Sequence, residues 1–139
     1  MSKYNQSKVV FQGIKFDSKQ ECSYYQYLLN LKESGEIVDI QLQPKKTLIP
    51  NFKKYGITIR GCTYSPDFLV TYKDGHQEYI DVKGMSTDAS KLRRKLWDFL
   101  FPNDILRWIA ASVKYGVDGW IDYDELQRIR RNNKKNKGG

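Results

Sequence analysis

The stretch TYSPDFLVTYKDGHQEYIDVK, residues 63–83, decides the fold because it reads as two strands joined by a tight turn. Lys73-Asp74-Gly75 is a three-residue loop with glycine last, a common hairpin connection because the third residue takes the left-handed conformation that glycine adopts cheaply. Side chains alternate with period two along each strand. This loop length therefore predicts that Asp67 lies opposite Asp81, on one face of the hairpin.

Two facing carboxylates need a counter-charge. Directly opposed residues have Cβ atoms about 5 Å apart, and like charges there are destabilising. Hard oxygen ligands suit magnesium, and Lys83, two residues beyond Asp81, can hold or help deprotonate an attacking water. The pattern predicts a divalent-metal site for phosphodiester chemistry. A two-residue loop would instead set Asp67 opposite Val82 and separate the two carboxylates.

A helix predicted over residues 18–34 supplies a third candidate ligand, Glu21. Ser18 and Glu21 match a capping box, in which the glutamate would serve only the helix end. The helical spacing also places Glu21 on the apolar face with Tyr24 and Leu28, and a carboxylate directed at an apolar interface needs a partner. Metal ligand and helix cap therefore stand as alternative roles for Glu21.

The remaining pattern predicts one mixed sheet with helices packed on it. Strands are expected at 36–43, 47–50, 56–60 and 105–110, and helices at 88–100 and 123–131. The inward face of the helix at 88–100 is expected to carry Leu92, Leu96, Phe99 and Leu100. Because this helix joins two strands, the strand at 105–110 should run parallel to the second strand of the hairpin.

Composition indicates a protein with one domain and a basic tail. A length of 139 residues allows burial of about two thirds of the unfolded surface. Residues 126–139 carry six of the 24 basic residues and none of the 16 acidic ones, which favours salt-sensitive contact with nucleic acid. The polar start lacks the apolar core of a signal peptide, and no run approaches a membrane span, so a cytoplasmic location without membrane contact is expected.

The same residues resemble a known superfamily. Ser65-Pro66-Asp67 followed by Ile80-Asp81-Val82-Lys83-Gly84, with Glu21 on a preceding helix, is similar to the PD-(D/E)XK nucleases, the restriction-endonuclease-like fold. Together with the basic run at 91–95, the stretch resembles more narrowly the phage endonuclease I group of four-way junction resolvases and related small phage nucleases. The likeness covers roughly residues 12–112, and Asp81 stands where several relatives have glutamate.

The resemblance implies a fold and a reaction. The fold is α/β, a restriction-endonuclease-like mixed central sheet flanked by helices, with the nuclease domain at 1–125 and a basic helix end and flexible tail at 126–139. The reaction is magnesium-dependent hydrolysis of DNA, selective for branched or four-way junctions, with manganese as a substitute metal. Metal ligands are Glu21, Asp67, Asp81 and the Val82 carbonyl, and Lys83 is the catalytic lysine. Junction cleavage needs two coordinated cuts, so a homodimer in a phage-infected bacterial cell is expected.

Basic residues are the expected DNA contacts. They are Lys91, Arg94 and Lys95 on one helix and Arg128, Arg130 and Arg131 on the last one.

Other functions remain open from the sequence alone. The chain is alternatively a nuclease of another specificity (flap, transposon-end or restriction-type), a DNA-binding module without turnover, or an RNA-directed or scaffold protein that uses the basic tail alone.

Overall fold

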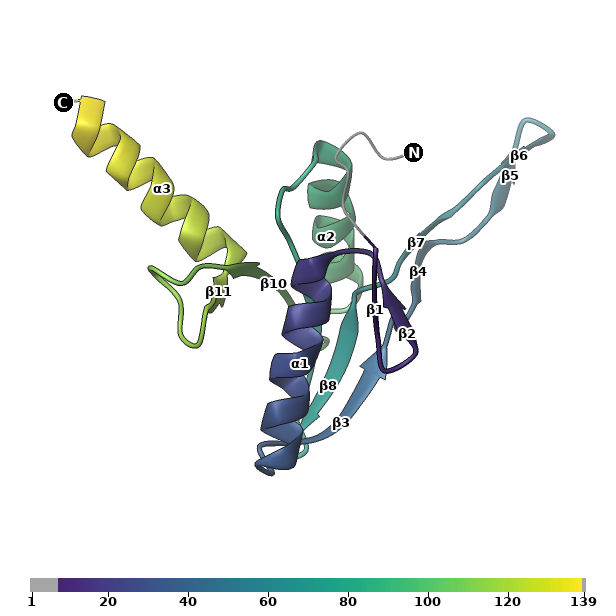
Figure 1. Ribbon diagram of the computed structural model, residues 1–139. Helices are drawn as coiled ribbons and strands as arrows, with labels where there is room; N and C mark the ends of the chain where they lie inside the picture. The colour runs from purple at the N-terminus through teal and green to yellow at the C-terminus, as the bar shows by residue number, and fades with distance from the viewer. Residues whose placement is uncertain (1–7, 139) are drawn as a thin grey trace.

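The computed structural model describes residues 8–138, which form a mixed α/β domain around a five-stranded sheet (Figure 1). The strands are β1 (Val9–Phe11), β2 (Ile14–Phe16), β3 (Ile37–Leu42), β4 (Lys46–Ile49), β5 (Phe52–Lys54), β6 (Ile57–Ile59), β7 (Cys62–Tyr64), β8 (Phe68–Tyr72), β9 (Gln77–Val82), β10 (Leu106–Ala111) and β11 (Trp120–Asp122). The helices are α1 (Lys19–Glu33), α2 (Asp88–Leu100) and α3 (Tyr123–Gly138).

The central sheet has the order β11-β10-β9-β8-β3. Strands β9 and β10 are parallel, and the other neighbours are antiparallel. Helix α2 makes the crossover between the two parallel strands, so the predicted strand-helix-strand unit is confirmed. The predicted strands at 36–43, 47–50 and 56–60 are also present, as β3, β4 and β6.

Side chains on the two faces of the sheet enter different cores. On β10, Ile109 joins the cluster that contains Leu28 of α1, whereas Trp108 packs with Tyr123 and Leu126 of α3. Alternation along the strand thus places α1 on one face and α3 on the other. Helix α2 adds a third cluster on the α3 side, centred on the fully buried Trp97.

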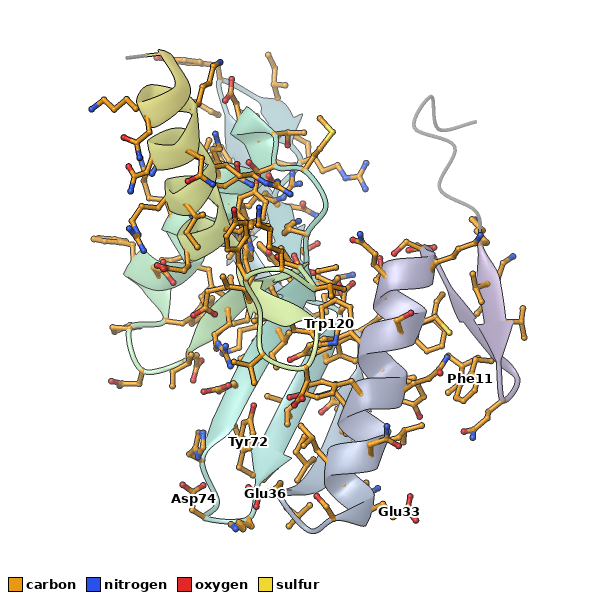
Figure 2. All side chains as sticks on the ribbon, turned by 60° about the vertical axis from the view of Figure 1, so that its left-hand side comes forward. Phe11, Glu33, Glu36, Tyr72, Asp74 and Trp120 are labelled. Atoms are coloured by element: carbon orange, nitrogen blue, oxygen red, sulfur yellow. The ribbon has the colours of Figure 1, made fainter. Side chains whose placement is uncertain are left out.

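Helix α1 begins where the sequence predicted. Ser18 is its N-cap and accepts a hydrogen bond from the Glu21 backbone at 3.1 Å, while Tyr24 and Leu28 are buried. Tyr24 meets the ring of Trp120 edge-on at 4.8 Å, which ties α1 to β11. The hairpin of β1 and β2, which the sequence analysis did not anticipate, packs on α1 through Phe11 and Tyr25 (Figure 2).

A predicted single strand over 63–72 was wrong. It is divided into β7, which pairs with β4, and β8, which pairs with β9 and β3. The break falls at Ser65-Pro66-Asp67, where Pro66 is fully buried and has no N–H to donate to a ladder. The backbone there leaves one sheet and enters the other.

Before this break, residues 45–64 form an arm. Strands β4 and β7 make its root, and the hairpin of β5 and β6 extends from the body of the domain (Figure 1). Every residue of β5 and β6 is exposed. The arm, residues 45–64, leads directly into Asp67.

Two other expectations differ from the structure. On α2, Leu92, Phe99 and Leu100 are exposed, whereas Trp97 and Ser90 face inward, because the helix packs its large indole against Tyr64 and Tyr79. Helix α3 runs to Gly138, although its end was predicted at 131 and a flexible tail after it. Among residues 8–138, no helix has the length and apolarity required to cross a membrane.

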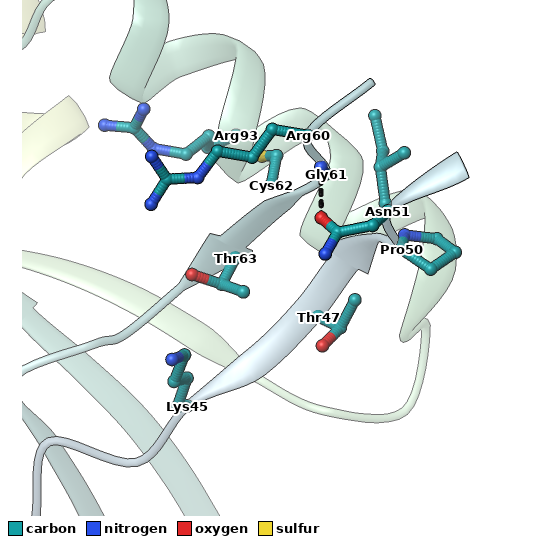
Figure 3. Close-up of a pocket in the computed structure, with 10 residues that line it drawn as sticks. Lys45, Thr47, Pro50, Asn51, Arg60, Gly61, Cys62, Thr63 and Arg93 are labelled. Atoms are coloured by element: carbon teal, nitrogen blue, oxygen red, sulfur yellow. Dashed lines mark hydrogen bonds between the residues drawn. The ribbon is translucent and has the colours of Figure 1, made fainter. Parts of the chain in front are cut away.

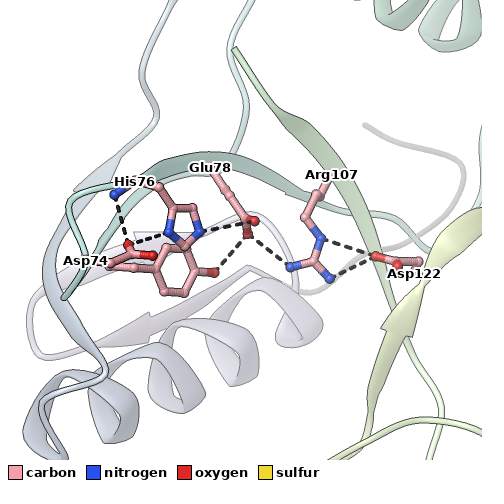
Figure 4. A network of polar contacts seen from close by, with 6 residues as sticks. Asp74, His76, Glu78, Arg107 and Asp122 are labelled. Carbon is pink, nitrogen blue, oxygen red and sulfur yellow. Dashed lines mark hydrogen bonds and ion pairs between the residues drawn. The ribbon is translucent and has the colours of Figure 1, made fainter. Parts of the chain in front are cut away.

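A polar network anchors β9, β10 and β11 at the far end of β9 from Asp81. It runs through Asp74, His76, Glu78, Arg107 and Asp122 (Figure 4). Arg107 joins Glu78 at 3.1 Å to Asp122 at 2.9 Å, and His76 stacks on Tyr72 with ring centroids 4.4 Å apart. His76 therefore supports the hairpin tip.

Candidate active site

One pocket of about 490 Å³ is lined by all four side chains that the sequence singled out. Glu21 comes from the first turn of α1, Asp67 from the residue before β8, Asp81 from β9, and Lys83 from just after that strand. Val82, Gly84, Met85 and Thr87 complete the lining. The pocket therefore lies where the N-terminal end of α1 meets the ends of β8 and β9.

The predicted hairpin register is confirmed. Phe68 pairs with Ile80 and Thr71 with Gln77, and the next pair outward along the same register is Asp67 with Asp81. The Asp67 carboxylate accepts a hydrogen bond from the Val82 backbone N–H at 2.8 Å. This bond holds one carboxylate at the junction of the arm and the sheet, beside the other.

Asp81 is buried and held on two sides. Its Oδ2 lies 3.1 Å from Lys83 Nζ and accepts a hydrogen bond from the Tyr64 hydroxyl at 2.6 Å. The Tyr64 oxygen in turn accepts a hydrogen bond from Trp108 Nε1 at 2.9 Å. Tyr64 thus orients Asp81, and Trp108 orients Tyr64.

The roles of Tyr64 and Trp108 were not predicted from the sequence. Trp108 lies 44 residues beyond Tyr64, on a strand reached only after the α2 crossover. Its ring also lies 4.9 Å from Lys83 Nζ and 3.9 Å from the Arg94 guanidinium carbon. No local spacing in the sequence signals this packing, because it depends on the order of strands in the sheet.

The carboxylates are electrostatically strained. Burial raises the pKa of Asp67 to about 9, and the charges of Asp81 and Glu21 add to the rise against the hydrogen bond from Val82. Burial also raises the pKa of Glu21 to about 7, helped by Asp17 and Asp81 and opposed by a backbone hydrogen bond at Asp17 and by Lys83. Ionisation of both groups is therefore disfavoured in the pocket, and a cation beside them would stabilise their charged forms.

A divalent metal fits this donor set. Magnesium binds through one or two carboxylates and keeps several waters, and Asp67 and Asp81 supply such a pair with Glu21 within electrostatic range. Across the described part of the chain, no three acidic, Cys or His side chains are grouped closely enough to hold a metal by themselves. The fit therefore rests on two carboxylates, with water completing the coordination.

The predicted DNA contacts divide into two groups. Lys91 and Lys95 are exposed on α2 and line a shallow hollow with Arg94 and Asp98. Arg94 is half-buried on Trp108 and forms an ion pair with Asp124 at 2.9 Å, so it joins α2 to α3. On α3, Arg128 pairs with Glu125, while Arg130 and Arg131 are exposed.

Glu21→Gln separates the helix-cap role from the metal role. The Ser18 hydroxyl would still accept the backbone N–H at position 21, so we expect a loss of well under about 1 kcal/mol in the free energy of unfolding. In the magnesium-dependent nuclease that the sequence leads us to expect, removal of a negative charge from the pocket should lower DNA cleavage at least about tenfold, equal to about 1.4 kcal/mol of transition-state stabilisation. Thermal melting and initial cleavage rates measure both. A stable and fully active variant would exclude Glu21 from the site.

One family model matches the chain, over residues 1–117, and its description is "Protein of unknown function (DUF1064)". The match includes every residue of the pocket described above and ends before β11 and α3. No curated protein and no solved structure matches the chain significantly.

Proposed function

The chain belongs to the DUF1064 family, and from its carboxylate pocket we propose that it is a metal-dependent DNA endonuclease with a restriction-endonuclease-like core. The observation that carries the proposal is one pocket lined by Glu21, Asp67, Asp81 and Lys83. The like charges of these carboxylates favour a cation between them, and the Lys83 amine lies 3.1 Å from one of them. This combination of groups suits metal-dependent hydrolysis of a phosphodiester.

Each side chain has a distinct part. Asp67 and Asp81 would hold magnesium or manganese, Glu21 would add charge to the site, and the Val82 carbonyl is a further candidate ligand. The bound metal would polarise the scissile phosphate and lower the pKa of water. Lys83 holds the attacking water and offsets charge that develops on the phosphate. Tyr64 keeps Asp81 in place through its 2.6 Å hydrogen bond.

The proposal is tested with labelled DNA. Matched duplex, flap, single-stranded and four-way junction substrates are incubated with protein in magnesium, in manganese and in chelator. We expect cleavage only with metal, and Asp81→Asn should abolish it while the variant remains folded. Absence of cleavage on all substrates, or unchanged cleavage by Asp81→Asn, would refute the proposal and leave a DNA-binding module without turnover.

Selectivity for branched or four-way junctions is a finer proposal that rests on the sequence resemblance. The same substrate panel tests it, because a resolvase cuts the junction far faster than the matched duplex. A homodimer follows from the need for two coordinated cuts. Sedimentation of the protein with and without junction DNA measures that stoichiometry.

Truncation after Gln127 tests the basic end of α3. Arg130 and Arg131 are exposed, so they are free to contact phosphates without reading base sequence. We expect the truncated protein to bind every DNA form more weakly by a similar factor, with a shallower dependence of log affinity on log salt concentration. Fluorescence anisotropy at several salt concentrations measures both. An unchanged salt slope would leave these residues with a role in solubility only.

A further inference from the structure

A second hollow, of about 590 Å³, lies at the root of the arm, and its charged lining is entirely basic (Figure 3). Lys45 precedes β4, Arg60 follows β6, and Arg93 comes from α2. Figure 3 shows the three cationic side chains around one space, with the guanidinium groups of Arg60 and Arg93 near each other. The other lining residues carry no negative charge.

These three charges have no partner within the described chain. Among residues 8–138, no ion pair or side-chain hydrogen bond involves Lys45, Arg60 or Arg93. The adjacent Lys46 differs, because it pairs with Asp104 and lies over the ring of Phe101. Like charges gathered in a hollow repel one another, so the arrangement favours binding of an anion.

The hollow is held open by the backbone at its rim. Asn51 accepts a hydrogen bond from the Gly61 N–H at 2.7 Å, which fixes the point where the arm narrows. A Cβ at Gly61 would lie 2.0 Å from the Ile49 carbonyl oxygen, so only glycine permits this approach. Thr47 and Thr63 add hydroxyl groups to the lining. The donors therefore occupy fixed elements and need little rearrangement to bind phosphate oxygens.

The arm continues this basic surface. Residues 45–66 contain no acidic residue, and Lys53 and Lys54 lie on the outer hairpin. Tyr55 at the tip is 89 % exposed, beside exposed Phe52 and Ile57. An isolated two-stranded ribbon is marginally stable in water, and a ribbon of this kind fits a DNA groove. Because the arm is positively charged, a polyanion is its expected partner.

The hollow adjoins the candidate active site through one strand. Thr63 lines the hollow, and the next residue, Tyr64, donates its hydrogen bond to Asp81. Side chains of consecutive strand residues point to opposite faces, so Tyr64 reaches Asp81 from the other face of β7, and this one strand separates the hollow from the carboxylate pocket. This adjacency is expected of a surface that guides a strand to the reacting phosphate.

We infer that the hollow of Lys45, Arg60 and Arg93, with the arm beyond it, binds the sugar-phosphate backbone of double-stranded DNA next to the cleavage site. The inference rests on the proposed nuclease function and extends it by naming the surface that holds the substrate. The three cations contact successive phosphates, and the arm follows a groove. None of these residues takes part in hydrolysis.

The test compares two triple variants of equal charge. One is Lys45→Gln, Arg60→Gln and Arg93→Gln, and the control is Lys8→Gln, Lys32→Gln and Lys114→Gln at exposed positions outside the hollow and arm. Binding to a labelled DNA duplex is measured in chelator across a salt series. We expect the hollow variant to bind at least about tenfold more weakly, with the salt slope reduced by about 2 to 3, because each lost phosphate contact removes about 0.9. The control should change affinity less than about threefold.

Several outcomes would overturn the inference: equal effects of the two triple variants, absence of DNA binding by the parent, or tighter binding to matched duplex RNA. Lys53→Gln with Lys54→Gln gives a second test if the hollow variant fails to fold, since both side chains are exposed, and it should also weaken binding. Failure of the proposed function is distinguishable. A parent that binds through the hollow but never cleaves refutes the nuclease, whereas a hollow variant that binds and cleaves as the parent refutes this inference alone.

Discussion

Lys83→Met should lower the single-turnover rate of DNA cleavage at least about a thousandfold and leave DNA affinity within about twofold. The amine lies 3.1 Å from Asp81 and 4.9 Å from the Trp108 ring, so it faces the carboxylates of the proposed active site. Methionine keeps an unbranched stem of similar length against Trp108. The variant should therefore fold, and the lost amine should act on the transition state alone.

Lys95→Met is the matched control. Lys95 is exposed on α2, where the sequence analysis expects contact with phosphates. Its loss should weaken binding and leave the single-turnover rate at saturating DNA unchanged. Cleavage rates measured at saturating protein report the effect on chemistry, and DNA affinities measured in chelator report the effect on binding. An equal loss of affinity and rate in Lys83→Met would make that lysine a phosphate clamp.

Asp67→Asn should stabilise the metal-free protein while it abolishes cleavage. Burial, with the charges of Asp81 and Glu21, raises the pKa of Asp67 from 3.8 to about 9, so at pH 8 the folded chain must keep a proton that the unfolded chain loses, and this costs stability. Asparagine is neutral in both states, avoids that cost and can still accept the hydrogen bond from Val82. We expect the melting temperature in chelator at pH 8 to rise by at least about 3 °C, which corresponds to roughly 1 kcal/mol in a domain of this size.

The folding stability of the parent protein depends on pH in a defined direction. The folded chain keeps the Asp67 proton up to about pH 9, whereas the unfolded chain loses it near 3.8. The folded state binds more protons between these values, so this contribution to stability is complete below the lower value and is lost as pH rises through the upper one. Asp67→Asn should flatten that dependence in chelator. Magnesium should raise the melting temperature of the parent and have little effect on the variant.

A metal-free variant that melts below the parent at pH 8 would contradict this account. Asp39→Asn is a control of the same chemistry, because Asp39 is exposed on β3. It should change neither the melting temperature nor the cleavage rate appreciably. The opposite signs of the effects on stability and activity at position 67 are typical of a carboxylate that is retained for function.

Local sequence determined the hairpin. The three-residue loop with Gly75 fixed which residues of β8 and β9 face each other, so Asp67 and Asp81 were placed together without knowledge of the rest of the chain. The N-cap at Ser18 and the bounds of α2 were equally predictable, since turn and cap preferences depend on neighbours in the sequence. The parallel direction of β10 followed from the crossover rule.

Tertiary structure decided the remaining features. The buried side of α2 is Trp97 rather than Leu92 and Phe99, because the helix packs against β4 and β10, where the Trp97 indole fills the space beside Tyr64. The division of the strand at Pro66 depends on which sheet each half joins. This division places β7 in the arm and positions the Tyr64 hydroxyl to donate a hydrogen bond to Asp81.

The sequence by itself determined the carboxylate pair and the lysine of the candidate site, because residues within one hairpin are related by a short, fixed register. It did not determine the bonds of Trp108 to Tyr64 or the basic hollow of Lys45, Arg60 and Arg93. Those residues come from segments whose separation is set only when β10 and α2 pack on the sheet. Such contacts depend on the burial of a common core, a property of the whole chain that no local pattern specifies.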